Sequence, residues 1–343
     1  MNQPLPACAF CGAAMELILD FGEVALAGGF LQPQQFALEQ KYPLRLAYCG
    51  ACYAVQVADE VDADVLFRDY FYFSSAIGTL REHFERYAKE VTERFLHPRD
   101  ATVLEFGCND GVLLRPLADQ GIKTVIGVDP AANVLGTIDD PRLQLVNAFF
   151  DEQAAERIID EHGHADVIMA NNVYAHIADI QGTTRAVHRV LKKDGVFVFE
   201  VHYLGKGLEE MQYDMIYHEH LYYYSLISAA AHFARYDMTV FDVKPVPIHG
   251  GSLRFYVCKN EGRFRSQTSP AVETAPRAAQ APREPCAGSP ASRECPTVGD
   301  SSGCERERCP SPSAPDSRAS NTPSDPTRKP QATAPAMRHL PRG

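Results

Sequence analysis

Residues 212–225 are unusually rich in groups that take up or donate protons, and they include Tyr217, Glu219 and His220. A neutral imidazole can remove a proton at neutral pH, and a phenol or carboxylate beside it can orient it or stabilise its charged form. On a helix, Tyr217 and His220 would share one face. A single histidine is more often structural, and consecutive tyrosines more often serve packing. The combination favours a site of proton transfer.

Two pairs of cysteines near the N-terminus have the spacing of metal ligands. Cys8 and Cys11 form one C-x-x-C pair, and Cys49 and Cys52 form the other. Two such turns facing each other make a tetrahedral four-sulfur site for zinc. The alternative is that one pair is redox-active or merely buried. Because four thiolates leave no open coordination position, we expect a structural metal.

The turns at these pairs are expected to use Gly12 and Gly50, because glycine adopts the backbone conformations that tight turns need. The remaining cysteines show no ligand pattern, and we expect their thiols to be reduced. They are Cys108, Cys258, Cys286, Cys295, Cys304 and Cys309.

From residue 101 onward, short apolar segments alternate with helical patterns, which predicts a mainly parallel, doubly wound α/β sheet. Strands are expected at 101–106, 124–129, 143–149, 165–170, 195–201, 238–243 and 252–257. Helices are expected at 112–120 and 184–191, the second followed by a turn at 192–194. Ligands of such sheets bind at the carboxyl ends of the strands, so the chemistry is expected there.

A glycine loop follows the first of these strands. Glu105, Gly107 and Gly111 form an E-x-G-x-x-x-G pattern, which differs from the G-x-G-x-x-G of dinucleotide-binding sheets. The loop resembles the first motif of class I S-adenosylmethionine-dependent methyltransferases. Asp129 ends the next strand, where its carboxylate can accept hydrogen bonds from ribose hydroxyls. The resemblance implies that the cofactor is bound by Glu105, Gly107, Asn109, Gly111, Asp129, Asn171 and Asn172.

Composition and charge change near residue 261. Residues 262–343 hold 12 Lys+Arg and 8 Asp+Glu, which leaves 21 and 36 in residues 1–261 and gives net charges of +4 and −15. The acidic body argues against a nucleic-acid partner, because phosphates favour clustered Lys and Arg. No apolar run approaches a bilayer span, and no secretory signal pattern is evident. These features predict a cytoplasmic enzyme that acts on small molecules.

The last part of the sequence cannot form an apolar core. Residues 262–343 contain 14 of the 24 prolines, and their only Ile, Leu, Val or Phe residues are Phe264, Val272, Val298 and Leu340. We therefore expect disorder over 262–343. Two explanations remain open, which are a genuine flexible tail and an out-of-frame translation after a frameshift.

Seven features together resemble one family, the bacterial C-methyltransferases of nucleotide-linked ketosugars, found in deoxysugar antibiotic pathways. The resemblance covers about residues 8–257. The features are the two C-x-x-C pairs, Lys41-Tyr-Pro-Leu, Tyr70-Phe-Tyr72-Phe-Ser74-Ser75, the Glu105–Gly111 loop, Asn171-Asn172-Val-Tyr-Ala-His176-Ile, the Tyr217–His220 run and His249-Gly250-Gly251-Ser-Leu-Arg254.

This resemblance implies a catalytic set that includes the proton-transfer cluster. His220 corresponds to the general base, with Tyr217 and Glu219 supporting it. His176 and Tyr72 correspond to residues that face the same pocket. The family also has a C-terminal α/β domain that helps to enclose the nucleotide sugar, so the replacement of that domain by residues 262–343 affects the expected substrate affinity.

The resulting prediction has three parts: a zinc-binding domain at 1–66, an S-adenosylmethionine-dependent methyltransferase domain at 67–261, and a disordered tail at 262–343. The resemblance implies methyl transfer to C3 of a nucleotide-linked 4-keto deoxysugar through an enolate. Two alternatives remain open, which are an O- or N-methyltransferase of another small molecule and an inactive remnant.

Overall fold

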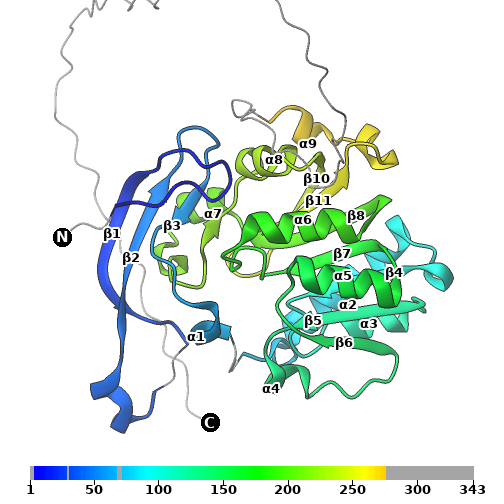
Figure 1. Cartoon of the computed structure of the whole chain (residues 1–343), viewed down its shortest axis with the longest axis horizontal. Coiled ribbons are helices and arrows are strands. Elements are labelled where there is room, and N and C mark those ends of the chain that lie inside the picture. Colours follow the sequence, from blue (N-terminus) through cyan, green and yellow to red (C-terminus); the bar gives the residue numbers. More distant parts are fainter. Residues whose placement is uncertain (1–3, 29–30, 68–71, 276–343) are drawn as a thin grey trace, which may run out of the picture. The chain divides into compact units, whose positions relative to one another are not determined.

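Parallel strands form the centre of the main sheet, as the alternating apolar pattern predicts. The computed structural model describes residues 4–28, 31–67 and 72–275 (Figure 1), so Tyr70 and residues 276–343 of the predicted tail lie outside the described part. The seven strands of this sheet lie in the order β10-β11-β8-β7-β4-β5-β6. They are β4 (Thr102–Phe106), β5 (Thr124–Asp129), β6 (Leu143–Asn147), β7 (Ala165–Asn171), β8 (Leu191–His202), β10 (Met238–Val246) and β11 (Ser252–Lys259).

Strands β4 to β8 are parallel, whereas β11 is antiparallel to both β8 and β10. Side chains alternate between the two faces. On β4, Val103 belongs to the buried cluster of α2 and α3, and Leu104 to that of α5, α6 and α8. The helices are α1 (Ala63–Phe67), α2 (Gly78–Phe95), α3 (Leu114–Asp119), α4 (Ala132–Leu135), α5 (Glu152–His162), α6 (Ile180–Val190), α7 (Leu204–Glu209), α8 (Leu226–Ala234) and α9 (Pro270–Glu273). The predicted doubly wound α/β sheet is confirmed.

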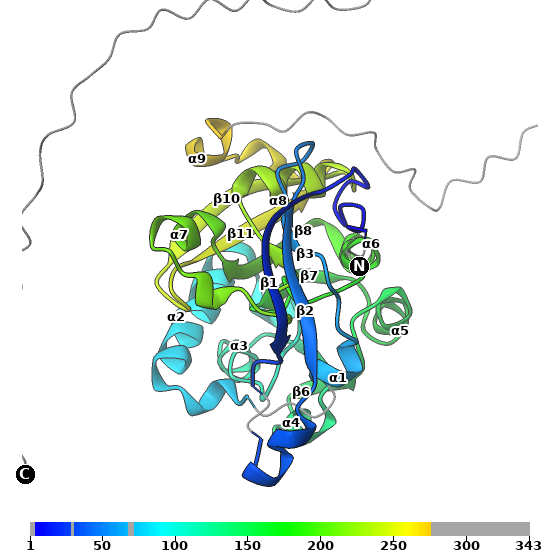
Figure 2. The ribbon, with the colours of Figure 1, turned by 90° about the vertical axis from the view of Figure 1, so that its left-hand side faces the viewer.

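A second, antiparallel sheet lies in the order β1-β2-β3-β9. Figure 2 shows β1 (Glu16–Ala25) and β2 (Lys41–Tyr48) as long neighbouring strands, and β3 (Val55–Val57) follows. The fourth strand, β9 (Tyr222–Tyr223), comes from far along the chain, inside the predicted methyltransferase domain. The predicted boundary at residue 66 therefore separates β9 from β1, β2 and β3 in the sequence, although the four strands form one sheet.

The folded unit continues past its predicted end at residue 261. The Phe264 ring is 5% exposed and lies 5.3 Å from the ring of Phe95 and 5.6 Å from that of Phe241. Residues 263–266 form a short 3₁₀ helix, and α9 follows. The prediction of disorder is wrong for residues 262–275, because one aromatic side chain anchors this segment to the core. For residues 276–343 it stays a prediction.

The expected turn at 192–194 is part of β8, which begins at Leu191. The pairing of β7 with β8 shifts register there: Ala165 lies opposite Leu191, and Val167 lies opposite Val196. The polar residues 192–194 are accommodated by this irregularity rather than by a separate turn. Among the described residues, no helix is long and apolar enough to cross a membrane.

Candidate active site and zinc site

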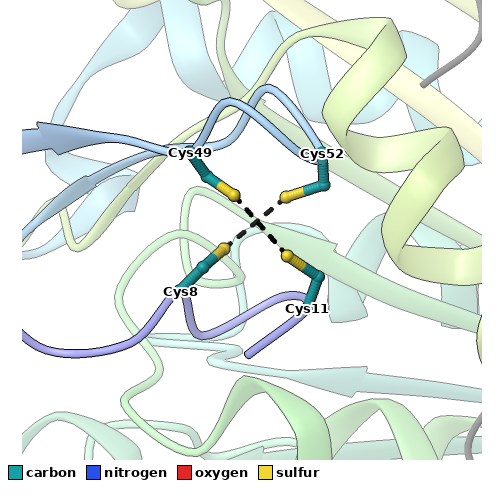
Figure 3. A group of neighbouring side chains, drawn as sticks. All are labelled: Cys8, Cys11, Cys49 and Cys52. Carbon is teal, nitrogen blue, oxygen red and sulfur yellow. Dashed lines mark hydrogen bonds between the residues drawn. The ribbon is translucent and has the colours of Figure 1, made fainter. Parts of the chain in front are cut away.

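The four N-terminal cysteines point toward a common centre (Figure 3). Their sulfur atoms all lie within 4.8 Å of one another, and the Sγ atoms of Cys8 and Cys52, and of Cys11 and Cys49, are 3.5 Å apart. Zn–S bonds of about 2.3 Å in a tetrahedron place the sulfurs about 3.8 Å from one another. All four thiols are free of disulfides. The cluster fits a zinc ion held by four thiolates, as predicted.

The two cysteine turns share one hydrogen-bond pattern. The N–H of Gly12 donates to the Cys8 carbonyl at 2.8 Å, and the N–H of Tyr53 donates to the Cys49 carbonyl at 2.9 Å. Gly12 has φ of 76° and Tyr53 has φ of 60°, whereas Gly50 is not in the left-handed region. The prediction for Gly50 is therefore wrong. The second turn uses a tyrosine in a conformation that bulky residues rarely adopt.

A cavity of about 480 Å³ opens at the carboxyl ends of β4, β5, β7 and β8. This volume is typical of small-molecule sites. Most of the predicted site residues line it: Tyr72, Gly107, Asn109, Asp129, Asn171, Asn172, His176, Tyr217, Glu219 and His220. Two predicted cofactor residues, Glu105 and Gly111, do not line the cavity. Glu105 lies behind the cavity wall, where it accepts a hydrogen bond from Asn171.

Asp129 is held at the end of β5 by two backbone donors. The Asn109 N–H donates to its Oδ2 at 2.8 Å, and the Ala131 N–H donates to its Oδ1 at 2.9 Å. Burial raises the pKa of Asp129, and these two donors oppose that shift. Each carboxylate oxygen retains a further acceptor position. Asp129 is thus able to accept hydrogen bonds from the hydroxyls of a ligand.

The Asn109 side chain has a role that the sequence did not indicate. Its Nδ2 donates to the Tyr72 carbonyl at 2.9 Å, and its Oδ1 accepts the Ser74 N–H at 3.0 Å. Its backbone φ is 49°, in the left-handed region that asparagine tolerates. Asn109 therefore anchors the segment that carries Tyr72 to the wall of the cavity.

Buried acceptor atoms lie behind the glycine loop. Asn171 Nδ2 donates to Glu105 Oε1 at 3.0 Å, but Glu105 Oε2, Asn171 Oδ1 and Asp110 Oδ1 are buried without a hydrogen-bond partner among the described residues. Burial raises the pKa of Glu105 to about 8, so its carboxyl holds a proton at neutral pH. Unpaired buried acceptors are costly and call for a donor. Of these residues Asn171 lines the cavity, so its Oδ1 can accept from a ligand with N–H donors, such as the α-ammonium group of S-adenosylmethionine.

The close packing of the Gly107 backbone against a neighbouring side chain can be tested by substitution. Its φ is 66°, and a Cβ atom built on it would lie 2.6 Å from Val173 Cγ2. We expect Gly107→Ala to displace the loop after β7 and to weaken S-adenosylhomocysteine binding at least about tenfold. Isothermal titration calorimetry measures this.

The matched control is Gly121→Ala. Gly121 has φ of 78°, but no atom lies within 4 Å of its added Cβ. The control should lose about 1 kcal/mol of stability through backbone strain and keep its affinity. Equal affinity in wild type and both variants would show that the loop does not contact the cofactor.

A tyrosine and a histidine form a hydrogen-bonded pair on the cavity wall. His220 Nδ1 lies 2.9 Å from the Met215 carbonyl, so this nitrogen carries the proton that it donates. His220 Nε2 accepts the Tyr217 hydroxyl at 2.7 Å. Residues 217–220 form a turn rather than a helix, and the turn brings the two rings together. Burial lowers the pKa of His220 to about 4, so the imidazole is neutral.

Further titratable groups face the same pair. The His176 ring centroid lies 5.0 Å from that of His220, and burial lowers the His176 pKa well below its ordinary value. Burial, followed by the charge of Glu219, raises the pKa of the Tyr217 phenol. Tyr72 is 39% exposed at the cavity, where burial raises its pKa. Neutral imidazoles and protonated phenols therefore surround this end of the cavity.

Among the cavity residues outside the predicted set are Met215, His202 and His249. Met215 orients His220 through its backbone carbonyl, so its side-chain type carried no signal. His202 ends β8, and its Nε2 lies 2.7 Å from Gln212 Oε1. His249 belongs to the His-Gly-Gly run quoted for the family resemblance. Both histidines line the cavity, and their positions at or near strand ends could have identified them.

His232, a buried histidine that does not line the cavity, is expected to make the folded state less stable at acidic pH. His232 is fully buried, its Nε2 lies 2.7 Å from Thr184 Oγ1, and burial lowers its pKa from 6.5 to about 3. The folded state thus binds fewer protons than the unfolded state between pH 6.5 and 3, so stability falls as the pH falls through this window. By pH 4.5 we expect His232 to account for a loss on the order of 2 kcal/mol.

Urea denaturation at pH 7 and pH 4.5 measures this loss. His232→Gln should reduce the difference between the two pH values, whereas the control His164→Gln, at an exposed position, should leave it unchanged. An unchanged difference in the His232 variant would contradict the prediction.

Comparisons with known proteins agree with these two sites. Residues 80–243 match a family model described as "Methyltransferase domain", and residues 8–67 match one described as "Putative zinc binding domain". The central sheet with its cavity corresponds to the part that matches a methyltransferase domain, and the four-cysteine cluster lies in the part that matches a zinc-binding domain. The chain is therefore similar to S-adenosylmethionine-dependent methyltransferases in its central part and to zinc-binding domains in its N-terminal part.

Among its relatives is the C-methyltransferase NovU of Streptomyces niveus, which is 34% identical over 253 residues. The match covers 73% of this chain and 60% of NovU, so the chain spans less than two thirds of that relative's length. The ubiquinone biosynthesis O-methyltransferase of Azorhizobium caulinodans is 29% identical over 107 residues, covering 31% of this chain and 42% of that protein. The magnesium protoporphyrin IX methyltransferase of Synechocystis, solved with bound SAH, aligns at 12% identity over 52% of this chain and 83% of its own, with a TM-score of 0.41.

Proposed function

We propose that this chain is a cytoplasmic S-adenosylmethionine-dependent C-methyltransferase that acts on C3 of a nucleotide-linked 4-keto deoxysugar through an enolate. The Tyr217–His220 pair carries this proposal, because it places a neutral base and a hydroxyl donor in the cavity lined by Asp129 and Gly107. The relation to NovU, which is named as a C-methyltransferase, supports carbon as the methyl acceptor.

Methylation at carbon requires a carbon nucleophile, which forms when a proton beside a ketone is removed. His220 Nε2 would take this proton after the substrate displaces the Tyr217 hydroxyl from it. The electron pair of the broken C–H bond forms a carbon–carbon double bond, and the π electron pair of the ketone moves onto its oxygen. The released Tyr217 hydroxyl and an N–H of His176 can donate hydrogen bonds to that oxygen. Glu219, which lines the same cavity, would be the carboxylate that supports the imidazolium formed on His220.

S-adenosylmethionine, when bound, supplies an electrophilic methyl group to such a nucleophile. Asp129 and the backbone at Gly107 would hold its ribose and amino-acid portions, and the unpaired Asn171 Oδ1 would accept from its ammonium group. These residues come from strand ends of a rigid sheet. Their fixed positions supply much of the rate, because the reacting atoms are already aligned.

The second candidate is O- or N-methylation of another small molecule. The ubiquinone biosynthesis O-methyltransferases favour it, although they match shorter stretches of this chain than NovU does. Such a reaction needs no enolate, and in it His220 would remove a proton from a hydroxyl or amine rather than from a carbon. A third candidate is an inactive remnant, which would show neither proton exchange nor methyl transfer.

One assay separates the three candidates. Purified protein is incubated with S-adenosylmethionine and a dTDP-4-keto-6-deoxy sugar in deuterated water, and the products are analysed by NMR and mass spectrometry. Deuterium at C3 of the recovered, unmethylated sugar together with a product that carries a new methyl group on C3 supports the proposal. Methyl transfer to oxygen or nitrogen without exchange supports the second candidate. Neither exchange nor transfer, with S-adenosylhomocysteine still bound, overturns the proposal for this chain.

A further inference from the structure

Residues 217–220, the proton-transfer loop, are connected to the zinc site through hydrogen bonds made by β3. Ala9, which lies between Cys8 and Cys11, donates its N–H to Gln56 Oε1 at 2.9 Å. Gln56 lies in β3, is 4% exposed, and is paired with Tyr222 of β9. The Val57 N–H donates to the Leu221 carbonyl at 2.9 Å, and Leu221 directly follows His220.

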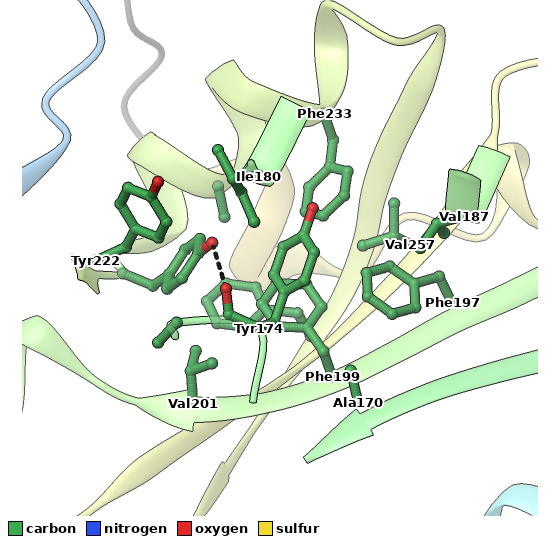
Figure 4. Packing of buried hydrophobic residues seen from close by; sticks show 14 of the residues in the cluster. Ala170, Tyr174, Ile180, Val187, Phe197, Phe199, Val201, Tyr222, Phe233 and Val257 are labelled. Atoms are coloured by element: carbon green, nitrogen blue, oxygen red, sulfur yellow. Dashed lines mark hydrogen bonds between the residues drawn. The ribbon is translucent and has the colours of Figure 1, made fainter. Parts of the chain in front are cut away.

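Residues of the zinc-binding domain also contact the chain on both sides of His220. His218 is 1% exposed, and its Nε2 lies 3.2 Å from the Pro43 carbonyl of β2. The ring of Phe10, from the first cysteine turn, lies 5.2 Å from the ring of Tyr222. Figure 4 shows Tyr222 at the border of the aromatic cluster that contains Tyr174. The proton-transfer loop is therefore fixed at His218 before His220 and at Tyr222 after it.

Strand β9 reaches the second histidine as well. The Tyr222 N–H donates to the Ala175 carbonyl at 3.2 Å, and the Tyr222 hydroxyl donates to the Ala178 carbonyl at 2.9 Å. These two acceptors flank the loop that carries His176. The relative position of His176 and His220 thus depends on where β3 places β9.

We infer that Gln56 is a positioning residue: it links the zinc-bound cysteine turn to β9 and so fixes His220 against His176. This inference rests on the proposed function for its catalytic consequence, but its structural part stands on the contacts above. Gln56 is not among the residues that line the cavity, and it acts on the proton-transfer groups through β9. A metal site in a separate domain thereby controls the geometry of the proton-transfer groups.

The test compares Gln56→Met, which removes the acceptor oxygen and preserves size, with Gln34→Met at an exposed position of the same domain. In Gln56→Met we expect amide hydrogen exchange over residues 217–224 to speed up about tenfold. We expect zinc content and S-adenosylhomocysteine affinity to stay unchanged. In the methyl-transfer assay, kcat should fall about tenfold, while KM stays within about twofold.

A second measurement uses the wild-type chain. Removal of zinc by a chelator should accelerate exchange over 217–224 before it affects β4 and β5. Unchanged exchange in this segment, in the variant or after chelation, overturns the inference, as does an acceleration spread evenly over the whole chain. Amide hydrogen exchange is measured without substrate, so the role of Gln56 can be confirmed even if no methyl transfer is found. Failure of this inference is therefore distinguishable from failure of the proposed function.

Discussion

Replacing His220 by alanine is expected to lower kcat for methyl transfer at least about 100-fold and to abolish deuterium exchange at C3. The neutral Nε2 of His220 is the proposed proton acceptor, and its orientation is fixed by the Nδ1–H donated to Met215. Alanine removes the base and leaves the cofactor end of the cavity intact. Quench-flow or steady-state assays measure kcat, and NMR measures exchange.

The pH profile of the same reaction gives an independent check. Burial lowers the His220 pKa to about 4, so the base stays unprotonated above that pH. The acid limb of kcat/KM should therefore lie well below pH 6.5, where an exposed histidine would place it. His164→Ala, at an exposed position, is the matched control and should behave as wild type. Exchange that persists in His220→Ala with normal S-adenosylhomocysteine affinity would refute the role of His220.

Replacing Cys49 by serine is expected to remove the zinc and unfold the N-terminal domain. Four-thiolate sites contribute on the order of 10 kcal/mol to the folding of small units at neutral pH. The Cys49 turn leads directly into β3, so β9 should lose its pairing partner at the same time. Metal analysis, limited proteolysis and the methyl-transfer assay measure these effects, and activity should fall at least about 100-fold.

Cys258→Ser is the matched control for this substitution. Cys258 is a fully buried free cysteine in β11, outside the zinc cluster. Its replacement should cost some core stability and leave the zinc content at that of wild type. Retention of zinc and of normal protease resistance by Cys49→Ser would show that the other three cysteines suffice.

Local spacing predicted which residues lie at the strand ends around the cavity. Gly107 and Asp129 line the cavity because each lies at the carboxyl end of a strand, and strand ends are encoded by short apolar runs. The four zinc ligands were also predictable, since each C-x-x-C turn is closed within its own few residues. Glu105 was placed correctly in the loop, but its position behind the cavity wall depends on Asn171 of another strand.

Contacts between distant segments could not be predicted in this way. The pairing of β3 with β9 joins residues more than a hundred and fifty positions apart, and two-residue strands have no recognisable periodicity. The carbonyl of Met215 and the left-handed Tyr53 act through the backbone, so their side-chain types carry no signal. Sequence spacing thus specified which groups the protein has for methyl transfer and zinc binding, because those motifs are local. The packing of two sheets against one loop set how His220, Tyr217 and His176 face one another, because that geometry depends on long-range pairing and burial.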